Sequence, residues 1–156
     1  MRFTRLTPTH HRFEAVSSDG ASQRHDMETR SLLTHDFVHF ALESEAGLKQ
    51  SFFGLLAEGR SYDELAMPAS GEAAQTEGVV GALQSALKGE IDAASFVSGY
   101  RTYCAAIGST PPAWLTADVI DRAVARFRAL EGLWRATPFG EAMELSFPPR
   151  ATAAQC

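Results

Sequence analysis

The chain has 156 residues, of which 45% are hydrophobic and 21% are charged, and its formal net charge at pH 7 is −5. These values are ordinary for a globular protein, and the length fits one domain that buries roughly two-thirds of its unfolded surface. The negative charge argues against a general phosphate-binding surface, and therefore against nucleic acid as a partner.

The cysteines and the N-terminal residues indicate the cellular compartment in which the protein is expected. The two cysteines, Cys104 and Cys156, give no disulfide framework, and Cys104 falls in a helical pattern as a small buried apolar residue. Residues 1–5 lack the apolar core of a signal peptide. No apolar run reaches the ~18 residues of a membrane-spanning helix. We therefore expect a cytoplasmic protein of bacterial type without membrane contact.

The N-terminal part of the chain predicts a β-hairpin. Residues 1–7 and 12–16 favour strands, and turn-forming residues follow the second of them. Residues 8–11 connect the two strands, so His10 and His11 are expected to be exposed near the tip. Residues 20–28 are polar and predict a loop.

The middle of the chain predicts helices separated by short breaks, because apolar residues recur there at helical spacing. We expect a central helix capped by Thr29 or Ser31 and ended by Gly47. Asp92 and Thr116 are expected to cap later helices. The helices after the central one are expected at 48–58, 75–88, 92–107 and 117–135, with a short turn at 61–65. The small residues between this turn and the next helix favour a connector over a mobile loop covering a site.

Residues 142–147 give the clearest strand signal in the chain. Met143, Leu145 and Phe147 alternate with other residues and therefore share one face of a strand. A single strand needs a partner, and the N-terminal hairpin is the available one. We predict that residues 142–147 pair with residues 1–7 or 12–16.

These elements together predict an α+β fold. A small, mostly antiparallel sheet is formed by the N-terminal hairpin and the C-terminal strand, and it packs against about five helices. We expect a single domain over residues 1–150, followed by a flexible tail at residues 151–156.

The central helix carries the densest group of potential ligands in the sequence. His35, Asp36, His39 and Glu43 lie within about 100° of one another around the helix axis. A wholly apolar stripe, with Phe37 at its middle, occupies another side of the helix. Apolar residues also border the polar group, which predicts that it is partly buried and needs hydrogen-bond partners.

This group predicts a possible metal site. Histidines four residues apart can place both imidazoles on one transition metal, and a carboxylate one turn further can complete three ligands. The predicted ligands of a divalent transition metal are thus His35, His39 and Glu43, with Asp36 as an orienting group or base. The spacing is similar to the His-Glu-x-x-His helix of zinc peptidases, but Asp36 replaces the glutamate and is shorter by one methylene.

Helix geometry limits this hypothesis. His35 and Glu43 lie ~12 Å apart along the helix axis, so at most two of the three are expected on one ion. A ligand from elsewhere in the chain, or water, would complete the shell. Without a metal, the same pattern describes a polar helix face in which His35 hydrogen-bonds Asp36 or Glu43.

One stretch of the chain resembles a motif of small uncharacterised bacterial proteins of similar length. The residues that carry the likeness are His35-Asp36-x-x-His39-Phe40-x-x-Glu43, then Gly47-Leu48 and Phe52-Phe53-Gly54-Leu55. The resemblance implies only that His35, Asp36, His39 and Glu43 act together, and it names no reaction.

Two classes of function follow from the sequence. The first is an interaction or regulatory domain that binds a protein partner or a second copy of itself, with the polar stripe as a structural or contact surface. The second is a divalent-metal or small-ligand binding domain, in which the stripe of His35, Asp36, His39 and Glu43 could support hydrolysis. The net charge and the lack of a second motif favour the first class.

Overall fold

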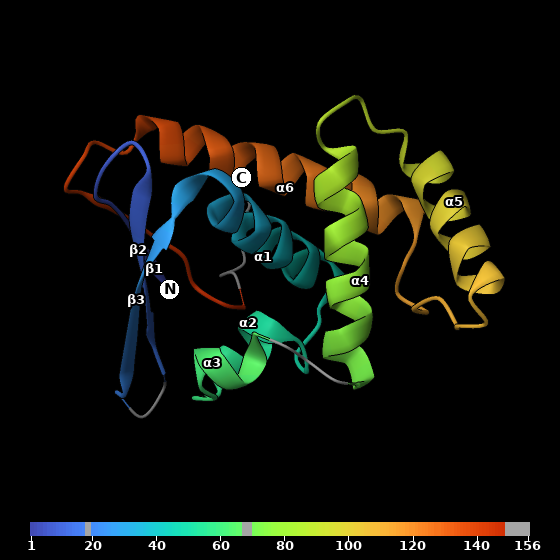
Figure 1. Cartoon of the computed structure of the whole chain (residues 1–156), viewed down its shortest axis with the longest axis horizontal. Coiled ribbons are helices and arrows are strands. Elements are labelled where there is room, and N and C mark those ends of the chain that lie inside the picture. The colour runs from blue at the N-terminus through green and yellow to red at the C-terminus, as the bar shows by residue number, and fades with distance from the viewer. Residues whose placement is uncertain (18–19, 67–69, 149–156) are drawn as a thin grey trace, which may run out of the picture.

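The computed structural model describes residues 1–17, 20–66 and 70–148 (Figure 1). Within these residues the chain forms four strands and six α-helices, which confirms the predicted α+β fold. The strands are β1 (Arg2–Arg5), β2 (His10–Val16), β3 (Ser22–Glu28) and β4 (Ala142–Glu144). The α-helices are α1 (Thr34–Ala46), α2 (Phe52–Ala57), α3 (Tyr62–Leu65), α4 (Gly71–Ala86), α5 (Ala93–Ala106) and α6 (Ala117–Ala136). The predicted tail at residues 151–156 lies outside the described residues.

The strands form one antiparallel sheet in the order β3-β2-β1-β4. Phe3 of β1 lies opposite Met143 of β4, which confirms the predicted pairing of the C-terminal strand with the hairpin. The strand is shorter than predicted because the ladder reaches the start of β1 at the pair of Arg2 and Glu144. Two backbone hydrogen bonds between Met1 and Leu145 continue the contact beyond the ladder.

The prediction of a loop at residues 20–28 is wrong, because most of this segment is strand β3. Only Met27 is buried within the strand, so the alternation of apolar residues that marks other strands is missing. Backbone pairing with β2 and a cross-strand ion pair hold it instead: the guanidinium of Arg12 donates two hydrogen bonds to the carboxylate of Asp26.

The prediction that His11 is exposed is also wrong. Strand β2 begins at His10, and the side chain of His11 points to the covered face of the sheet, where it is fully buried. Its ring stacks on Phe3 and meets the ring of Trp134 edge-on. The Nδ1 atom of His11 lies 3.3 Å from Oγ1 of Thr29, whereas its Nε2 atom has no hydrogen-bond partner among the described residues.

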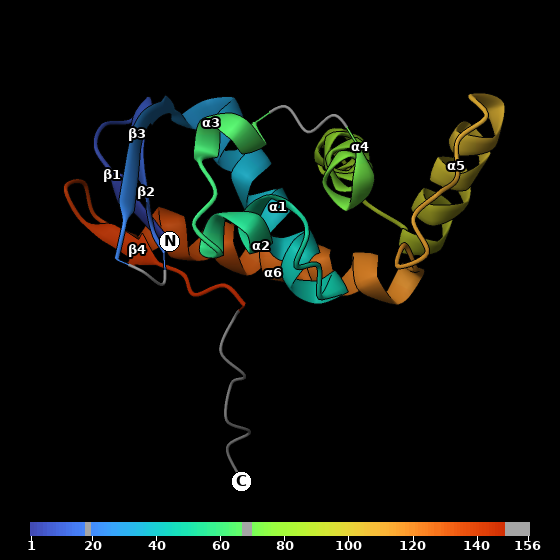
Figure 2. The same cartoon turned by 90° about the horizontal axis from the view of Figure 1, so that it is seen from below.

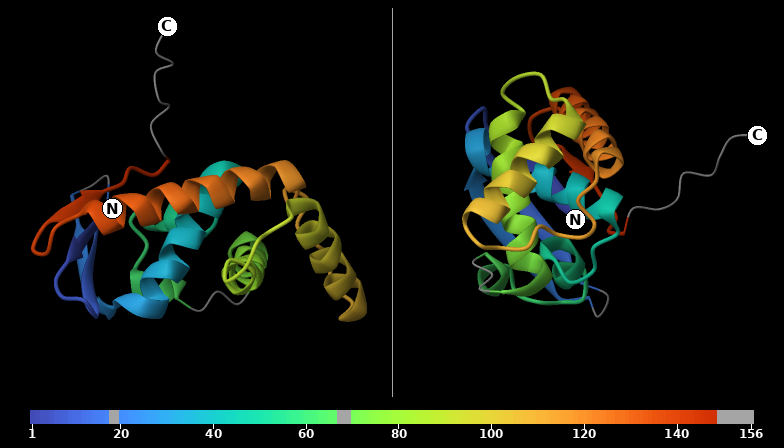
Figure 3. Two further views of the ribbon diagram at one scale, coloured as in Figure 1. Left: turned by 90° about the horizontal axis from the view of Figure 1, so that it is seen from above. Right: turned by 90° about the vertical axis from the view of Figure 1, so that its right-hand side faces the viewer.

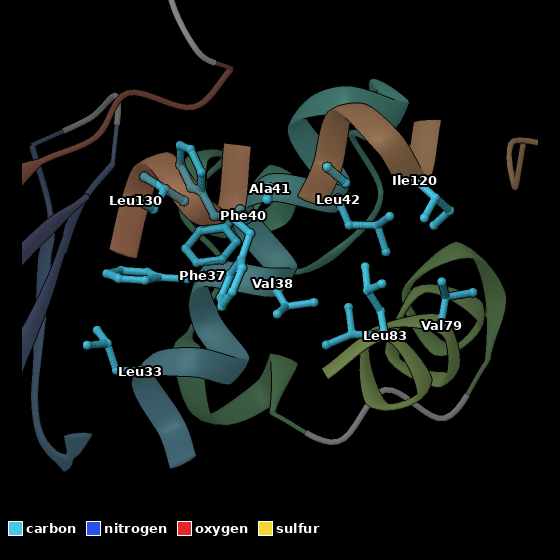
Figure 4. Close-up of a cluster of buried hydrophobic side chains, with 14 of the residues drawn as sticks. Leu33, Phe37, Val38, Phe40, Ala41, Leu42, Val79, Leu83, Ile120 and Leu130 are labelled. Carbon is cyan, nitrogen blue, oxygen red and sulfur yellow. The ribbon is translucent and has the colours of Figure 1, made fainter. Parts of the chain in front are cut away.

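Helix α1 is the centre of the molecule. It lies between the sheet and α4, and α6 runs beside it from the sheet to α5 (Figures 2 and 3). Every residue from Asp36 to Glu43 is buried, so α1 is covered on all sides. Phe37 packs against Phe3 of the sheet, and Figure 4 shows Val38 directed toward Leu83 of α4.

The ends of the helices follow the predictions in part. Asp92 accepts a hydrogen bond from the backbone N–H of Ser95, and Thr116 caps α6 in the same way, as predicted. Gly47 ends α1 in the left-handed conformation. The start of α1 differs, because a π-helical turn at Thr29–Leu33 precedes it.

Glu28 caps that turn in place of the predicted Thr29 or Ser31. The side chain of glutamate is longer than that of threonine or serine. Its carboxylate accepts hydrogen bonds from two backbone N–H groups, those of Arg30 and Ser31. Helix α2 begins at Phe52, later than predicted, and α4 begins at Gly71, earlier than predicted. Among the described residues no helix has the length and apolar character required to span a membrane.

Candidate metal centre

The site lies where α4 crosses α1. Val79 and Leu83 of α4 pack into the same core as Val38 and Leu42 of α1 (Figure 4). This packing brings Glu77, at the border of the packed face of α4, next to the polar side of α1. Two elements far apart in the sequence thereby contribute to one polar cluster.

The imidazoles of His35 and His39 both turn toward the carboxylate of Glu77. The Nε2 atom of His35 lies 3.0 Å from Oε1 of Glu77, and the Nε2 atom of His39 lies 2.7 Å from Oε2. One potential ligand atom from each of the three residues lies within 4.8 Å of the others. Two imidazole nitrogens and one carboxylate oxygen at this spacing can surround a single transition-metal ion.

Glu43 holds the other side of the His39 ring. Its Oε1 atom lies 3.0 Å from Nδ1 of His39, and its Oε2 atom accepts hydrogen bonds from the backbone N–H groups of Phe53 and Gly54. The Glu43 side chain is fully buried. A carboxylate on the far nitrogen of a metal-binding histidine fixes the tautomer and the orientation of the ring.

Asp36 lies beside His35, the other histidine of the cluster. Its Oδ1 atom is 4.0 Å from Nδ1 of His35, on the side of that ring opposite Glu77. The residue is buried, and its Oδ2 atom has no hydrogen-bond partner in the part of the chain that the structure describes. Burial raises the pKa of Asp36 to about 7, against the opposing influence of His39 and His35.

The electrostatics of the metal-free cluster centre on His39. Burial alone would lower the pKa of His39, but hydrogen bonds to Glu43 and Glu77, and the charges of these carboxylates, raise it to about 9. Hydrogen bonds from His35 and His39 hold the pKa of Glu77 well below its ordinary value. Near neutral pH the metal-free cluster therefore holds an imidazolium between two carboxylates.

The cluster has a closed side and an open side. The ring of Phe52 lies 5.6 Å from that of His39, and the ring of Tyr62 lies 5.3 Å from that of Phe52, so aromatic side chains stand against the inner side. The His39 side chain is only 4% exposed, whereas those of His35 and Glu77 are 30% and 41% exposed. Solvent can therefore approach from the side of His35 and Glu77.

The structure brings together two of the three predicted ligands and places the third elsewhere. His35 and His39 share one cluster, but Glu43 contacts the far nitrogen of His39 and not the Nε2 atom that faces the cluster. Glu77, from another part of the chain, lies beside the two histidines, where an additional ligand was expected. Asp36 lies where an orienting group for His35 would lie. The sequence does not single out Glu77, because no motif links it to the two histidines.

Comparison of this chain with models of known protein families, with curated protein sequences and with solved structures gave no match.

Proposed function

We propose that this protein binds a divalent transition metal through His35, His39 and Glu77. Two histidines and one carboxylate form the donor set of one class of catalytic zinc site, which keeps a fourth position for water, and of several non-haem iron sites. A metal held in this way polarises its bound water at neutral pH, so hydrolysis is the reaction class that fits best.

The observation that carries the proposal is the arrangement around His39. One ring nitrogen is held by the fully buried Glu43, while the other points into a cluster of ligand atoms contributed by two helices. An outer carboxylate that fixes one ring nitrogen while the other faces the ion is the usual support of a histidine metal ligand. The partial exposure of His35 and Glu77 leaves a route for an ion and for a small substrate.

The rival interpretation is that the cluster is a closed ion-pair network, with the imidazolium of His39 occupying the place of an ion. Zinc titration by calorimetry, followed by thermal unfolding with zinc, nickel or manganese, separates the two. We expect one site per chain, a higher melting temperature with metal, and loss of at least about 100-fold in affinity for His39→Ala and Glu77→Gln.

The matched control is Glu64→Gln, which removes an exposed carboxylate that pairs with Arg60 at the surface. This variant should bind zinc as the parent does. Equal melting temperatures of the parent with and without each metal would contradict the proposal. The polar cluster would then be a structural or partner-facing surface, and the interaction-domain hypothesis would replace the metal-binding one.

A bacterial source and a cytoplasmic location stay predictions from the sequence.

A further inference from the structure

A hollow of about 440 Å³ lies where three parts of the chain meet. The π-helical turn and the start of α1 form one side, the end of α4 forms a second, and the second half of α6 forms the third. The hollow is separate from the proposed metal centre, because none of His35, His39 and Glu77 lines it. The proposed function therefore makes no use of it.

The lining of this hollow is positively charged. Arg30 comes from the π-helical turn, Lys88 lies just after α4, and Arg128 belongs to α6. The only acidic residue in the lining is Glu131, and its carboxylate pairs with Arg135. Three positive charges and one negative charge leave a local formal charge of +2, in a chain whose net charge is −5.

The three cations have no partner within the described chain. Most of the described arginines pair with a carboxylate or donate to a backbone oxygen. Five described cations make no side-chain hydrogen bond or ion pair: Arg24, Arg30, Lys49, Lys88 and Arg128. Three of these five line this one hollow. Like charges held near one another repel, and a bound anion would remove that repulsion.

A phosphoryl group is the anion that suits this set of donors best. A phosphate monoester carries a charge of about −1.5 to −2 at pH 7 and has three terminal oxygens. The guanidiniums of Arg30 and Arg128 can each donate two parallel hydrogen bonds to such oxygens, and the ammonium of Lys88 adds a third positive charge. The hydroxyl of Thr34, which makes no hydrogen bond to other described residues, is a further donor in the lining. A carboxylate has one charge and two oxygens, so it would engage fewer of these groups.

The hollow also has room for an organic group beside the anion. Its 440 Å³ far exceeds the ~30 Å³ of one water molecule and lies within the range of about 300–1,000 Å³ that small-molecule sites occupy. Leu87 and Phe127 add apolar surface to the lining, and both pack on the hydrophobic core. A ring or short apolar chain attached to the phosphoryl group can therefore contact these two residues.

We propose that this hollow binds a small soluble phosphate monoester. Arg30, Lys88 and Arg128 hold the phosphoryl group, and the organic part lies against Leu87 and Phe127. The net charge of the chain does not prevent this binding, because salt screens exposed charges beyond about 8–10 Å and the local cations then dominate. Since the contacts are ionic, binding should weaken as salt is added. The proposal does not depend on metal binding at the other site.

Titration calorimetry of the full chain with phenyl phosphate tests the proposal, because this probe joins a phosphoryl group to an apolar ring. A chelator in the buffer keeps metal out of the other site. We expect one site per chain, with inorganic phosphate and benzoate each binding at least about tenfold more weakly, since each lacks one of the two groups. Arg30→Gln and Arg128→Gln should each lower the affinity for phenyl phosphate at least about tenfold.

Arg24→Gln is the matched control. It removes the same charge from another arginine without a hydrogen bond or ion pair, on β3 and outside the hollow, so it should bind phenyl phosphate as the parent does. A parent that does not bind phenyl phosphate would overturn the proposal, and so would an equal loss of affinity in Arg24→Gln. Benzoate binding as tightly as phenyl phosphate would exclude a phosphoryl site. Circular dichroism verifies that each variant is folded.

A lipid headgroup could present the same phosphoryl chemistry. Sedimentation with phosphatidylcholine vesicles that contain phosphatidic acid distinguishes this source. We expect the chain to remain in the supernatant, because the ligand is soluble. Sedimentation with these vesicles, without binding of phenyl phosphate in solution, would overturn the small-molecule proposal and assign the hollow to a membrane lipid.

Discussion

Glu43 holds His39 from one turn further along α1: its Oε1 atom lies 3.0 Å from Nδ1 of the imidazole, so that Nε2 faces Glu77. The second oxygen of Glu43 accepts from the N–H groups that begin α2. One buried carboxylate thus both orients the proposed ligand and fastens a neighbouring helix.

Glu43→Gln tests this double role. An amide cannot accept from the ring and from both backbone N–H groups as a carboxylate does. We expect zinc affinity to fall about 10–100-fold and the free energy of unfolding to fall by about 1.5–3 kcal/mol. Titration calorimetry and urea unfolding measure the two effects separately.

The control for this variant is Glu45→Gln on the same helix. Glu45 pairs with Arg122 and Arg126 of α6, so its replacement should lower stability without changing zinc affinity. Unchanged zinc affinity in Glu43→Gln would show that the carboxylate is only structural.

Zinc affinity should depend on pH through His39. A metal needs the neutral imidazole, and the pKa of His39 in the metal-free fold is about 9. Below that pH, zinc must displace a proton, so affinity should rise by up to about tenfold for each pH unit between about 6 and 8. Calorimetry in buffers of different ionisation enthalpy counts the released proton. An affinity that is constant over this range would contradict the protonated cluster.

The raised pKa of His39 also makes the stability of the metal-free fold depend on pH. Zinc affinity rises with pH, whereas this stability falls. The pKa of His39 is raised above the ordinary value of 6.5, so its contribution to stability is complete below pH 6.5 and is lost as pH rises through about 9. Added zinc should therefore raise the melting temperature more at the alkaline end of the range.

His11 should weaken the fold in mild acid. Burial lowers its pKa from 6.5 to about 4, so between these values the unfolded chain binds a proton that the folded chain does not. The associated stability is present above pH 6.5 and is lost as pH falls to about 4, by ~3 kcal/mol in total.

His11→Phe keeps an aromatic ring against Phe3 and Trp134 but cannot be protonated. Its free energy of unfolding should fall less than that of the parent between pH 7 and pH 4, as urea unfolding at each pH would show. Identical profiles for the parent and His11→Phe would place the acid sensitivity in other groups.

Gly54 is needed for the close contact between α2 and the segment before it. A Cβ there would lie 2.6 and 2.8 Å from the backbone carbonyl carbon and Cα of Lys49, and closer still to its carbonyl oxygen. Because backbone atoms cannot rotate aside, Gly54→Ala should destabilise the protein by about 1–3 kcal/mol or more.

Gly132→Ala is the matched helical substitution, in open space on α6, and it should stabilise by about 0.5–1 kcal/mol because alanine favours a helix. Urea unfolding compares the two. Equal changes in the free energy of unfolding for the two variants would mean that the backbone before α2 shifts to make room for the added methyl group.

The fold could be predicted wherever the signal was local. Caps and apolar spacing located α5 and α6 nearly to the residue, and the alternation around Met143 identified β4 and its pairing with the hairpin. Strand β3 could not be found in this way, because backbone pairing and the contact of Arg12 with Asp26 hold it at the edge of the sheet. His11 was misplaced because one residue of register decides which face of a strand is covered.

The site was predictable on one helix only. The spacing of His35 and His39 indicates a shared face, and helix geometry already limits the number of ligands that one helix can supply. The position of Glu77 beside the two histidines depends on the crossing of α1 and α4, which is set by core residues such as Val38 and Leu83. From the sequence alone, several carboxylates on other helices are equally good candidates for the third member of the cluster. Only the packing of the helices places Glu77 there.

The central position of β1 in the sheet has a consequence during synthesis. Its partner on one side, β2, follows within a few residues, but its partner on the other side is not translated until Ala142–Glu144. Until then a growing chain has one side of β1 unpaired and the apolar face around Phe3 incompletely covered. Exposed strand edges of this kind favour aggregation. A chain that ends before β4 would therefore expose one edge of β1 and should aggregate more readily than the full chain.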